Sequence, residues 1–273
     1  MQAGGNDFIL IDNRKSLIKN RKKSAMEFCQ RKFSVGADGL LLLEGSKTAD
    51  FRMRIFNPDG TEAEMCGNGI RCLIEFVYRK RLNPHPNPPP QVGREKREGG
   101  ISIQTADGIY SGKVKGGLVS VKMREPGEIR LNLKVKIKKK GYAVHFINFG
   151  VPHAIIFVDD LKKVDLKNLA PLIRNHREFH PRGTNVDFVK VVDCHSLILR
   201  TYERGVEEET FSCGTGASAA AIISYKLGKV KSPVKVSPIF GEPLKVVFDV
   251  GLKQIYLEGK TREVYEAECY LNH

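Results

Sequence analysis

A four-residue pattern that occurs twice constrains this chain of 273 residues more than any other feature. Cys66-Gly67-Asn68-Gly69 recurs later as Cys213-Gly214-Thr215-Gly216, and each copy leads directly into a segment with helical character. A cysteine placed in this way lies at a helix N-terminus. There the unpaired backbone N–H groups and the helix dipole favour thiolate over thiol, and they also bind an anion such as a carboxylate. The repeat therefore predicts two activated thiols that face one anionic ligand.

The helices expected after the two copies differ in character. After the first copy, apolar residues recur on one helix face, and basic residues at 79–81 suit the C-terminal end of a helix. After the second copy, residues 217–227 are rich in alanine and apolar on nearly every side, up to a glycine at position 228. We therefore expect an amphipathic first helix and a buried central second helix.

The sequence ahead of each copy is repeated as well. Residues 51–56 alternate apolar and basic side chains, which is typical of a strand, and lead through Phe56-Asn57 to Cys66. Residues 197–202 also favour a strand, and they lead through Tyr202-Glu203 to Cys213. This repeated order predicts an internal duplication, with two similar lobes that each build strands around one cysteine-capped helix.

Other elements follow from local patterns. Helices are expected at 24–33 and 166–173, and strands at 8–11, 40–43, 186–192, 244–250, 253–258 and 264–270, with several more between 101 and 158. The opening loop leaves no room for an element before the strand at 8–11. Residues 83–100 are rich in proline, then in charge and glycine, and are expected to form an extended surface loop.

The charge of the chain raises the question of acidic partners. The net charge is +14 and the sequence pI is about 9.5, which suits nucleic acid, an anionic membrane or a small carboxylate. The basic residues are spread along the chain, however, and the short basic runs at 21–23 and 138–140 lack interleaved aromatic residues. We therefore expect a solvated basic surface, with no nucleic acid and no membrane as partner. Without a membrane-spanning apolar run or a signal region, the predicted location is cytoplasmic.

Cysteine usage and known motifs bear on cofactors. Six cysteines in a chain of this size do not make a disulfide scaffold, and none forms the CxxC pairs of a zinc site. Cys194-His195 is adjacent but lacks a second ligand pair, so we interpret it as structural, and Cys72 is expected in the core. Neither GxGxxG after a strand nor GxxxxGK[ST] occurs. The prediction is no cofactor and no metal.

Two thiols that flank one carbon suit a definite reaction. Inversion of a stereocentre next to a carboxylate needs a base on one face to remove the proton and an acid on the other face to return one. Backbone N–H donors at a helix N-terminus can hold the carboxylate as negative charge grows on it.

Five motifs in a fixed order now make the sequence resemble one family. They are Gly5-Asn6-Asp7-Phe8, Phe56-Asn57-Pro58-Asp59-Gly60-Thr61-Glu62, Met65-Cys66-Gly67-Asn68-Gly69-Ile70-Arg71-Cys72, Asn185-Val186-Asp187-Phe188, and Tyr202-Glu203-Arg204-Gly205 ahead of Cys213. Together they resemble the diaminopimelate epimerases over the whole chain. One Cys-Gly-x-Gly alone is weak evidence, whereas five ordered motifs are specific.

The resemblance implies cofactor-independent interconversion of LL- and meso-diaminopimelate, a small dicarboxylate diamino acid, by a two-base mechanism. It also implies a homodimer and an α/β (α+β) fold of two pseudosymmetric lobes, each a strongly curved mixed β-sheet around a central helix. The first lobe, with Cys66, is then expected at 1–125 plus 262–273, and the second lobe, with Cys213, at 126–261.

The resemblance further implies roles for individual residues. Cys66 and Cys213 are the paired acid and base, and His153 and Glu203 assist them. The N–H donors for the reacting carboxylate come from Gly67, Asn68, Gly214 and Thr215. The groups that bind the far end of the substrate are Asn6, Asn57, Asn185 and Arg204, and a forked guanidinium suits a carboxylate.

The chain departs from the family pattern at several positions. Val151 stands where the family often has Asn before Pro-His, and Gly39 where some members have Gln. The acidic run at 207–209 is one residue longer than the commonest form. The chain also begins inside the family's first motif, where a typical member has a short strand before it, so either the recorded start is too late or the lobe lacks an edge strand.

Several alternatives stay open. His153 can be a structural histidine, and Asn6 and Asn57 can be turn residues. A related racemase for proline, hydroxyproline or histidine keeps both cysteines, but Asn57, Asn185 and Arg204 argue against it. A basic nucleic-acid-binding protein rests on net charge alone.

Overall fold

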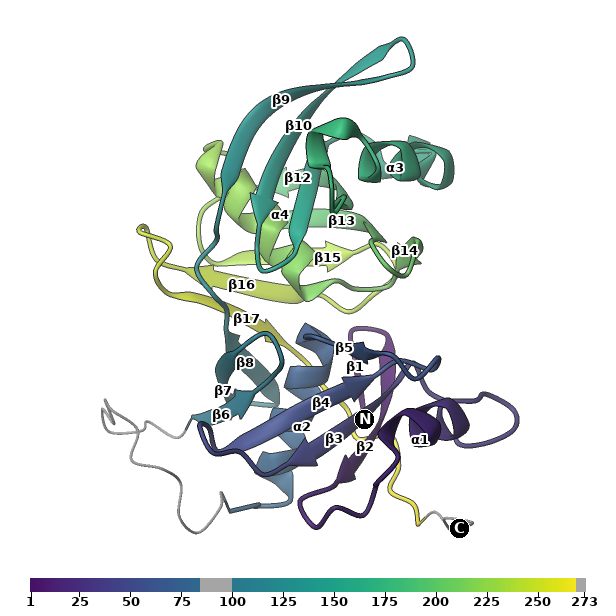
Figure 1. Cartoon of the computed structure of the whole chain (residues 1–273). Coiled ribbons are helices and arrows are strands. Elements are labelled where there is room, and N and C mark those ends of the chain that lie inside the picture. Colours follow the sequence, from purple (N-terminus) through teal and green to yellow (C-terminus); the bar gives the residue numbers. More distant parts are fainter. Residues whose placement is uncertain (84–99, 269–273) are drawn as a thin grey trace. The chain divides into compact units, whose positions relative to one another are not determined.

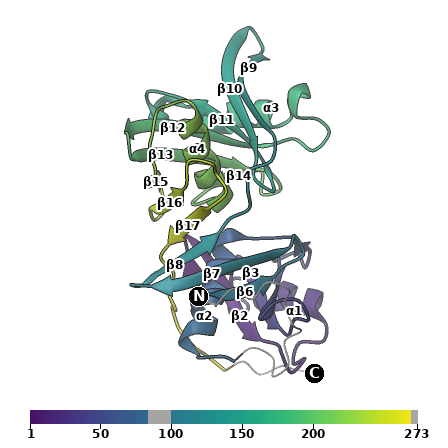
Figure 2. The same ribbon diagram turned by 90° about the vertical axis from the view of Figure 1, so that its left-hand side faces the viewer.

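The computed structural model describes residues 1–83 and 100–268 and divides the chain into two compact units. The first unit comprises the described residues within Met1–Val119 and Lys260–His273, and the second unit is Ser120–Gly259. Both units combine strands with helices (Figures 1 and 2), which confirms the predicted α+β class. Among the described residues, no helix has both the length and the apolar composition needed to cross a bilayer.

The first unit is a mixed sheet with two helices. Its elements are β1 (Gln2–Ala3), β2 (Asn6–Asp12), α1 (Arg21–Phe28), β3 (Gly39–Glu44), β4 (Phe51–Phe56), β5 (Glu62–Ala63), α2 (Gly67–Arg79), β6 (Ile101–Gln104) and β7 (Ile109–Lys115); the unit boundary falls within β8 (Leu118–Lys122). β2 pairs in parallel with β3, β3 antiparallel with β4, and β4 antiparallel with β5. β4 also pairs in parallel with β6, which pairs antiparallel with β7.

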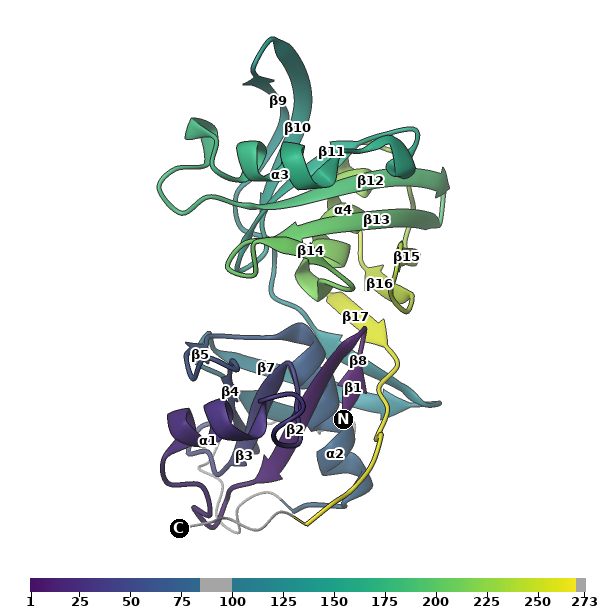
Figure 3. The same ribbon diagram turned by 90° about the vertical axis from the view of Figure 1, so that its right-hand side faces the viewer.

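The second unit repeats this arrangement (Figure 3). Its elements are β9 (Ile129–Ile137), β10 (Lys140–Asn148), β11 (Pro152–Phe157), η1 (Leu161–Lys163), α3 (Leu166–Arg174), η2 (Arg177–Phe179), β12 (Asn185–Asp193), β13 (Ser196–Glu203), β14 (Glu208–Thr210), α4 (Gly214–Lys226), β15 (Val234–Pro238), β16 (Leu244–Phe248) and β17 (Ile255–Gly259). β11 pairs in parallel with β12, β12 antiparallel with β13, and β13 antiparallel with β14. β13 also pairs in parallel with β15, which pairs antiparallel with β16.

Strand register makes individual positions in the two units equivalent. Phe8 on β2 pairs with Gly39 on β3, and His153 on β11 pairs with Asn185 on β12. His153 is therefore equivalent to Phe8. Asn185 on β12 is likewise equivalent to Gly39 on β3. Counting two residues onward along each of these strands makes Asp187 equivalent to Leu41.

The two cysteine-capped helices have the predicted characters. The apolar face of α2 is fully or almost fully buried and comprises Ile70, Leu73, Ile74 and Val77. This helix contacts β2, β3 and β4 of the first unit. The segment Ala219–Ile223 of α4 is completely buried, so the predicted central helix of the second unit is confirmed.

Some local predictions are wrong. The helix expected at 24–33 is α1, Arg21–Phe28, because the Asn20 side chain accepts from the backbone N–H of Lys23 and starts the helix earlier. A strand does precede β2: Gly4 and Gly5 have φ angles of 60° and 93°, which lets Gln2–Ala3 fold back as β1. The expectation of a missing edge element is thus overturned.

The C-terminal strands are partly as expected. β16 and β17 confirm the strands predicted near 244–250 and 253–258. Residues 264–268 form no strand, and the apolar Val264 and Tyr265 are exposed, so that prediction is wrong over the described residues. β15 was not expected, although Val234 and Val236 alternate with polar neighbours. Most of the loop predicted at 83–100 lies outside the described residues.

Candidate active site

Cys66 caps the helix of the first unit. Its backbone is extended, with φ −143° and ψ 118°, and its Sγ accepts a hydrogen bond from the backbone N–H of Gly69 at 3.4 Å. The cysteine is half-buried. The predicted thiol at a helix N-terminus is therefore confirmed for this copy, and a sulfur in this position receives a backbone donor and the positive end of the helix dipole.

Asn68 connects this cap to the first strand motif. Its Nδ2 donates to Oδ1 of Asn6 at 2.6 Å, and Nη2 of Arg71 donates to Oδ1 of Asn68 at 2.6 Å. The structure thus brings Cys66, Asn68 and Asn6 together. Asn57 is different, because its Nδ2 donates to Oγ1 of Thr61 at 2.9 Å and closes the turn after β4.

Cys213 caps the helix of the second unit in the same manner. Its φ is −118° and its ψ 112°, and its Sγ accepts from the backbone N–H of Gly216 at 3.3 Å. The hydroxyl of Thr215 also lies 3.3 Å from this sulfur. Unlike Cys66, Cys213 is buried.

A connected set of polar side chains lies behind the Cys213 cap. Nε2 of His153 is 3.0 Å from Oγ1 of Thr215, and Nδ1 of His153 is 2.7 Å from Oδ2 of Asp187. Oγ1 of Thr201 donates to Oδ1 of Asp187 at 2.7 Å, and Nδ2 of Asn185 is 3.3 Å from Nε2 of His153. The structure therefore joins three predicted site residues, His153, Asn185 and Thr215, in one network.

Asp187 and Thr201 were missed as site residues in the sequence. One signal was present: Asp187 lies in the middle of a strand that reads as buried, and a buried carboxylate needs polar partners. The identity of those partners depends on the register between β11, β12 and β13, which no local pattern shows.

Asn185 also contacts the segment after β13. Its Oδ1 accepts from the backbone N–H of Arg204 at 2.7 Å, while Nη1 of Arg204 donates to the carbonyl of Arg182 at 3.2 Å. Val151 lies two residues before His153, the place equivalent to Asn6 two residues before Phe8. An asparagine is therefore present at this place in the first unit and a valine in the second.

Burial dominates the electrostatics around Cys213. It raises the pKa of the Cys213 thiol well above its ordinary value, and the carboxylates of Glu203 and Asp187 raise it further. The hydrogen-bonding contact with Thr215 and the hydrogen bond from the Gly216 N–H act in the opposite direction. Burial likewise raises the pKa of Glu203. At Cys213, burial therefore opposes the predicted effect of the helix N-terminus, which favours the thiolate.

Two further cysteines, Cys72 and Cys194, differ in burial. Cys72 is completely buried, and burial raises its pKa to about 12, which confirms it as a core residue. Cys194 is exposed, and Nδ1 of His195 lies 2.9 Å from the carbonyl of Pro233. Within residues 1–83 and 100–268, no three His, Cys, Asp or Glu side chains are grouped to hold a metal ion.

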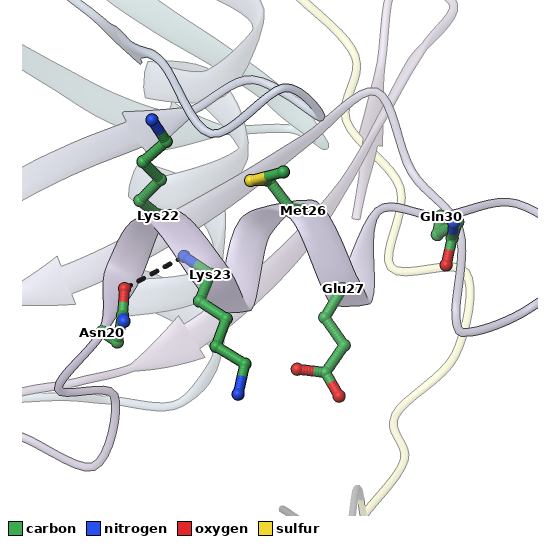
Figure 4. Close-up of a pocket in the computed structure, with 6 residues that line it drawn as sticks. All are labelled: Asn20, Lys22, Lys23, Met26, Glu27 and Gln30. Carbon is green, nitrogen blue, oxygen red and sulfur yellow. Dashed lines mark hydrogen bonds between the residues drawn. The ribbon is translucent and has the colours of Figure 1, made fainter.

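Two surface hollows of the first unit lie elsewhere. One is on α1 and is lined by residues between Asn20 and Gln30, whose long side chains project separately (Figure 4). The other is lined mainly by β2 and residues 263–267. None of the predicted site residues lines either hollow.

The chain is similar in sequence and fold to known proteins. A profile of the family described as diaminopimelate epimerase matches residues 1–130 and 145–264. The chain is 40% identical over 273 residues to a diaminopimelate epimerase of Chlorobaculum tepidum, covering 99% of this chain and 100% of that protein. It is 41% identical over 279 residues to one of Methanocella arvoryzae, covering 98% and 94%. A Bacillus anthracis phenazine biosynthesis protein of the PhzF family shares the fold, with a TM-score of 0.67 and 16% identity over 95% of this chain and 92% of that one. The chain belongs to the diaminopimelate epimerase family.

Proposed function

We propose that this protein is an isomerase that interconverts LL- and meso-2,6-diaminopimelate without a cofactor, with Cys66 and Cys213 as the two bases. The observation that carries the proposal is the repeated cap: each thiol accepts the N–H of the third residue after it, Gly69 or Gly216, at the start of a helix. Family membership supports the choice of substrate, and the repeated cap supports the two-base mechanism.

The mechanism needs both thiols at one α-carbon. One cysteine, as thiolate, removes the α-proton, and the other, as thiol, delivers a proton to the opposite face. The backbone N–H groups at Gly67, Asn68, Gly214 and Thr215 are the proposed donors to the α-carboxylate, on which negative charge builds up when the proton leaves. Cys213 is buried, next to two carboxylates that disfavour its thiolate, whereas Cys66 is only half-buried; we therefore assign Cys213 the role of the resting thiol and Cys66 the role of the first base.

The other predicted residues complete the proposal. His153 and Glu203 assist Cys213, and the hydrogen bond between Nε2 of His153 and Oγ1 of Thr215 supports this role for the histidine. Asn6, Asn57, Asn185 and Arg204 bind the distal end of the substrate. A guanidinium at Arg204 provides a planar pair of donors for the distal carboxylate, which proline and its hydroxylated form do not possess. We further expect a cytoplasmic homodimer.

A substrate panel tests the proposal. The protein is incubated in deuterated water with LL-diaminopimelate, L-proline, trans-4-hydroxy-L-proline and L-histidine, and α-deuterium incorporation is followed by mass spectrometry. We expect exchange and stereochemical inversion of LL-diaminopimelate alone. Exchange of proline or histidine with no exchange of LL-diaminopimelate would assign the chain a different substrate.

A further inference from the structure

Asp187 is a buried carboxylate that the two-base reaction does not require. Its side chain has no exposed surface, and it accepts from Thr201 and contacts His153. It also lies directly against the Cys213 cap, because a Cβ added at Gly216 would stand 2.7 Å from Oδ1 of Asp187. A buried charge is costly unless it is hydrogen-bonded, so this arrangement calls for an explanation.

The equivalent place in the first unit is apolar. There a Cβ added at Gly69 would meet Cδ2 of Leu41 at 3.1 Å and Cδ1 of Ile55 at 3.7 Å. Leu41 takes the place of Asp187, and Phe8 takes the place of His153. The same strand register places Ile55 where the second unit has Thr201. The two caps therefore have the same geometry, but polar side chains lie behind the cap of the second unit and apolar side chains behind the cap of the first.

The hydrogen bonds determine which nitrogen of His153 carries the proton. Oδ1 of Asn185 accepts from the Arg204 N–H, which leaves Nδ2 of Asn185 as a donor toward Nε2 of His153. The carboxylate of Asp187 accepts at Nδ1, so neutral His153 is protonated at Nδ1 and has its lone pair at Nε2. That lone pair faces the Thr215 hydroxyl, which in turn lies beside the Cys213 sulfur.

We propose that Asp187 is a positioning residue that, through His153 and Thr215, gives Cys213 an internal proton acceptor. This inference rests on the proposed role of Cys213. In the proposed step, the Cys213 S–H proton moves to Oγ1 of Thr215 while the Thr215 hydroxyl proton moves to Nε2 of His153. The products are a thiolate and an imidazolium whose Nδ1–H stays bonded to Asp187. The reverse transfer restores the thiol, so Cys213 can exchange its proton between turnovers.

Two effects of Asp187 on Cys213 have opposite signs. The charged groups that act on the sulfur are Glu203 from β13 and Asp187 from β12, and His153 from β11 is connected to it through the Thr215 hydroxyl. Through space alone, a nearby negative charge disfavours the thiolate, so its removal should speed alkylation of Cys213. Through the network, Asp187 stabilises the imidazolium that pairs with the thiolate, so its removal should slow alkylation. Whether removal of the Asp187 charge speeds or slows alkylation of Cys213 therefore distinguishes the through-space effect from the effect through the network.

The test compares alkylation of the two cysteines within one sample. Full-length wild type and Asp187→Asn are treated with iodoacetamide without substrate at neutral and mildly alkaline pH, and peptide mass spectrometry gives the rates at Cys66 and Cys213. We expect the Cys213 rate relative to Cys66 to fall about tenfold, the effect of one pKa unit. Asp193→Asn, the same change at an exposed position of β12, should leave the ratio unchanged. An unchanged or higher ratio in Asp187→Asn overturns the proposal.

Further measurements separate this proposal from folding defects and from the proposed function. Modification of the buried Cys72 reports unfolding of a variant. In a His153→Gln background, Asp187→Asn should no longer slow Cys213, and persistent slowing contradicts action through His153. In the wild-type protein, long-range ¹H–¹⁵N spectra should show His153 protonated at Nδ1, and protonation at Nε2 overturns the assignment. Turnover of LL-diaminopimelate is measured separately, so either claim can fail while the other stands.

Discussion

Nδ1 of His153 lies 2.7 Å from Oδ2 of Asp187, and neither side chain has exposed surface. The pair sits behind the thiol of Cys213, while the equivalent positions behind Cys66 hold a phenylalanine and a leucine. The duplicated fold therefore supplies two similar caps with different surroundings. This difference suits a reaction in which one thiol begins as acid and the other as base.

The contact between Gly216 and Asp187 predicts unequal tolerance at the two third-position glycines. A methyl group at Gly216 would stand 2.7 Å from a buried carboxylate oxygen that Thr201 also holds, whereas one at Gly69 would meet the flexible end of Leu41 at 3.1 Å. We expect Gly216→Ala to lower the free energy of unfolding by about 1–3 kcal/mol, as overpacking does. Gly69→Ala should cost less. Urea unfolding of both variants measures this, and equal losses would contradict it.

The raised pKa of Glu203 predicts how stability changes with pH. Burial raises this pKa above its usual value of 4.5, so on raising the pH the unfolded chain loses the proton first. Glu203 therefore makes the folded state less stable as the pH rises from 4.5 through its raised pKa. Glu203→Gln removes the titration, and we expect its unfolding free energy relative to wild type to increase across this window. Parallel pH curves for the two proteins would show that the carboxyl is not buried in this way.

Arg204 should determine affinity more than rate. Arg204→Lys keeps the charge but loses the planar fork, so we expect KM for LL-diaminopimelate to rise about tenfold, as for the loss of a charge-assisted hydrogen bond of about 1.5 kcal/mol. Arg200→Lys is the matched control, because Arg200 is engaged with Glu209 through Nε and Nη2 at 2.6 and 2.7 Å. That variant should lose stability with KM unchanged. A similar KM in both variants would remove Arg204 from substrate binding.

Cys72 should be dispensable for the reaction. It is completely buried on α2, and burial raises its pKa to about 12, so it carries no thiolate at neutral pH. Cys72→Ala should retain turnover while lowering the free energy of unfolding by about 1 kcal/mol, the usual size of a point-mutation effect. Steady-state kinetics beside thermal unfolding tests this, and abolished turnover in a folded variant would contradict the assignment.

The parts of the fold that the sequence predicted are those encoded locally. The alternation in β4, the apolar face of α2 and the apolar composition of α4 each depend on neighbouring residues, and each was correctly predicted. The cap positions of Cys66 and Cys213 followed from the adjacent glycines. Local patterns also failed where tertiary contacts decide: Val264 and Tyr265 have strand character, yet no strand forms there.

The network behind Cys213 lay beyond such reasoning for a physical reason. His153, Asp187 and Thr201 come from three strands, and they meet only because β11, β12 and β13 pair in one register. A shift of one residue in β12 would turn Asp187 to the other face of the sheet. The motif containing Asp187 was visible in the sequence, but its partners were not.

The central claim is that both Cys66 and Cys213 exchange protons with one α-carbon. It is tested most directly by following α-deuterium incorporation and inversion of LL-diaminopimelate in deuterated water for wild type, Cys66→Ser, Cys213→Ser and the control Cys72→Ser. The account predicts that each of the first two variants loses turnover about 10²–10⁴-fold, the usual contribution of a positioned acid or base, while Cys72→Ser stays active. Wild-type turnover in either Cys66→Ser or Cys213→Ser would contradict the two-base account.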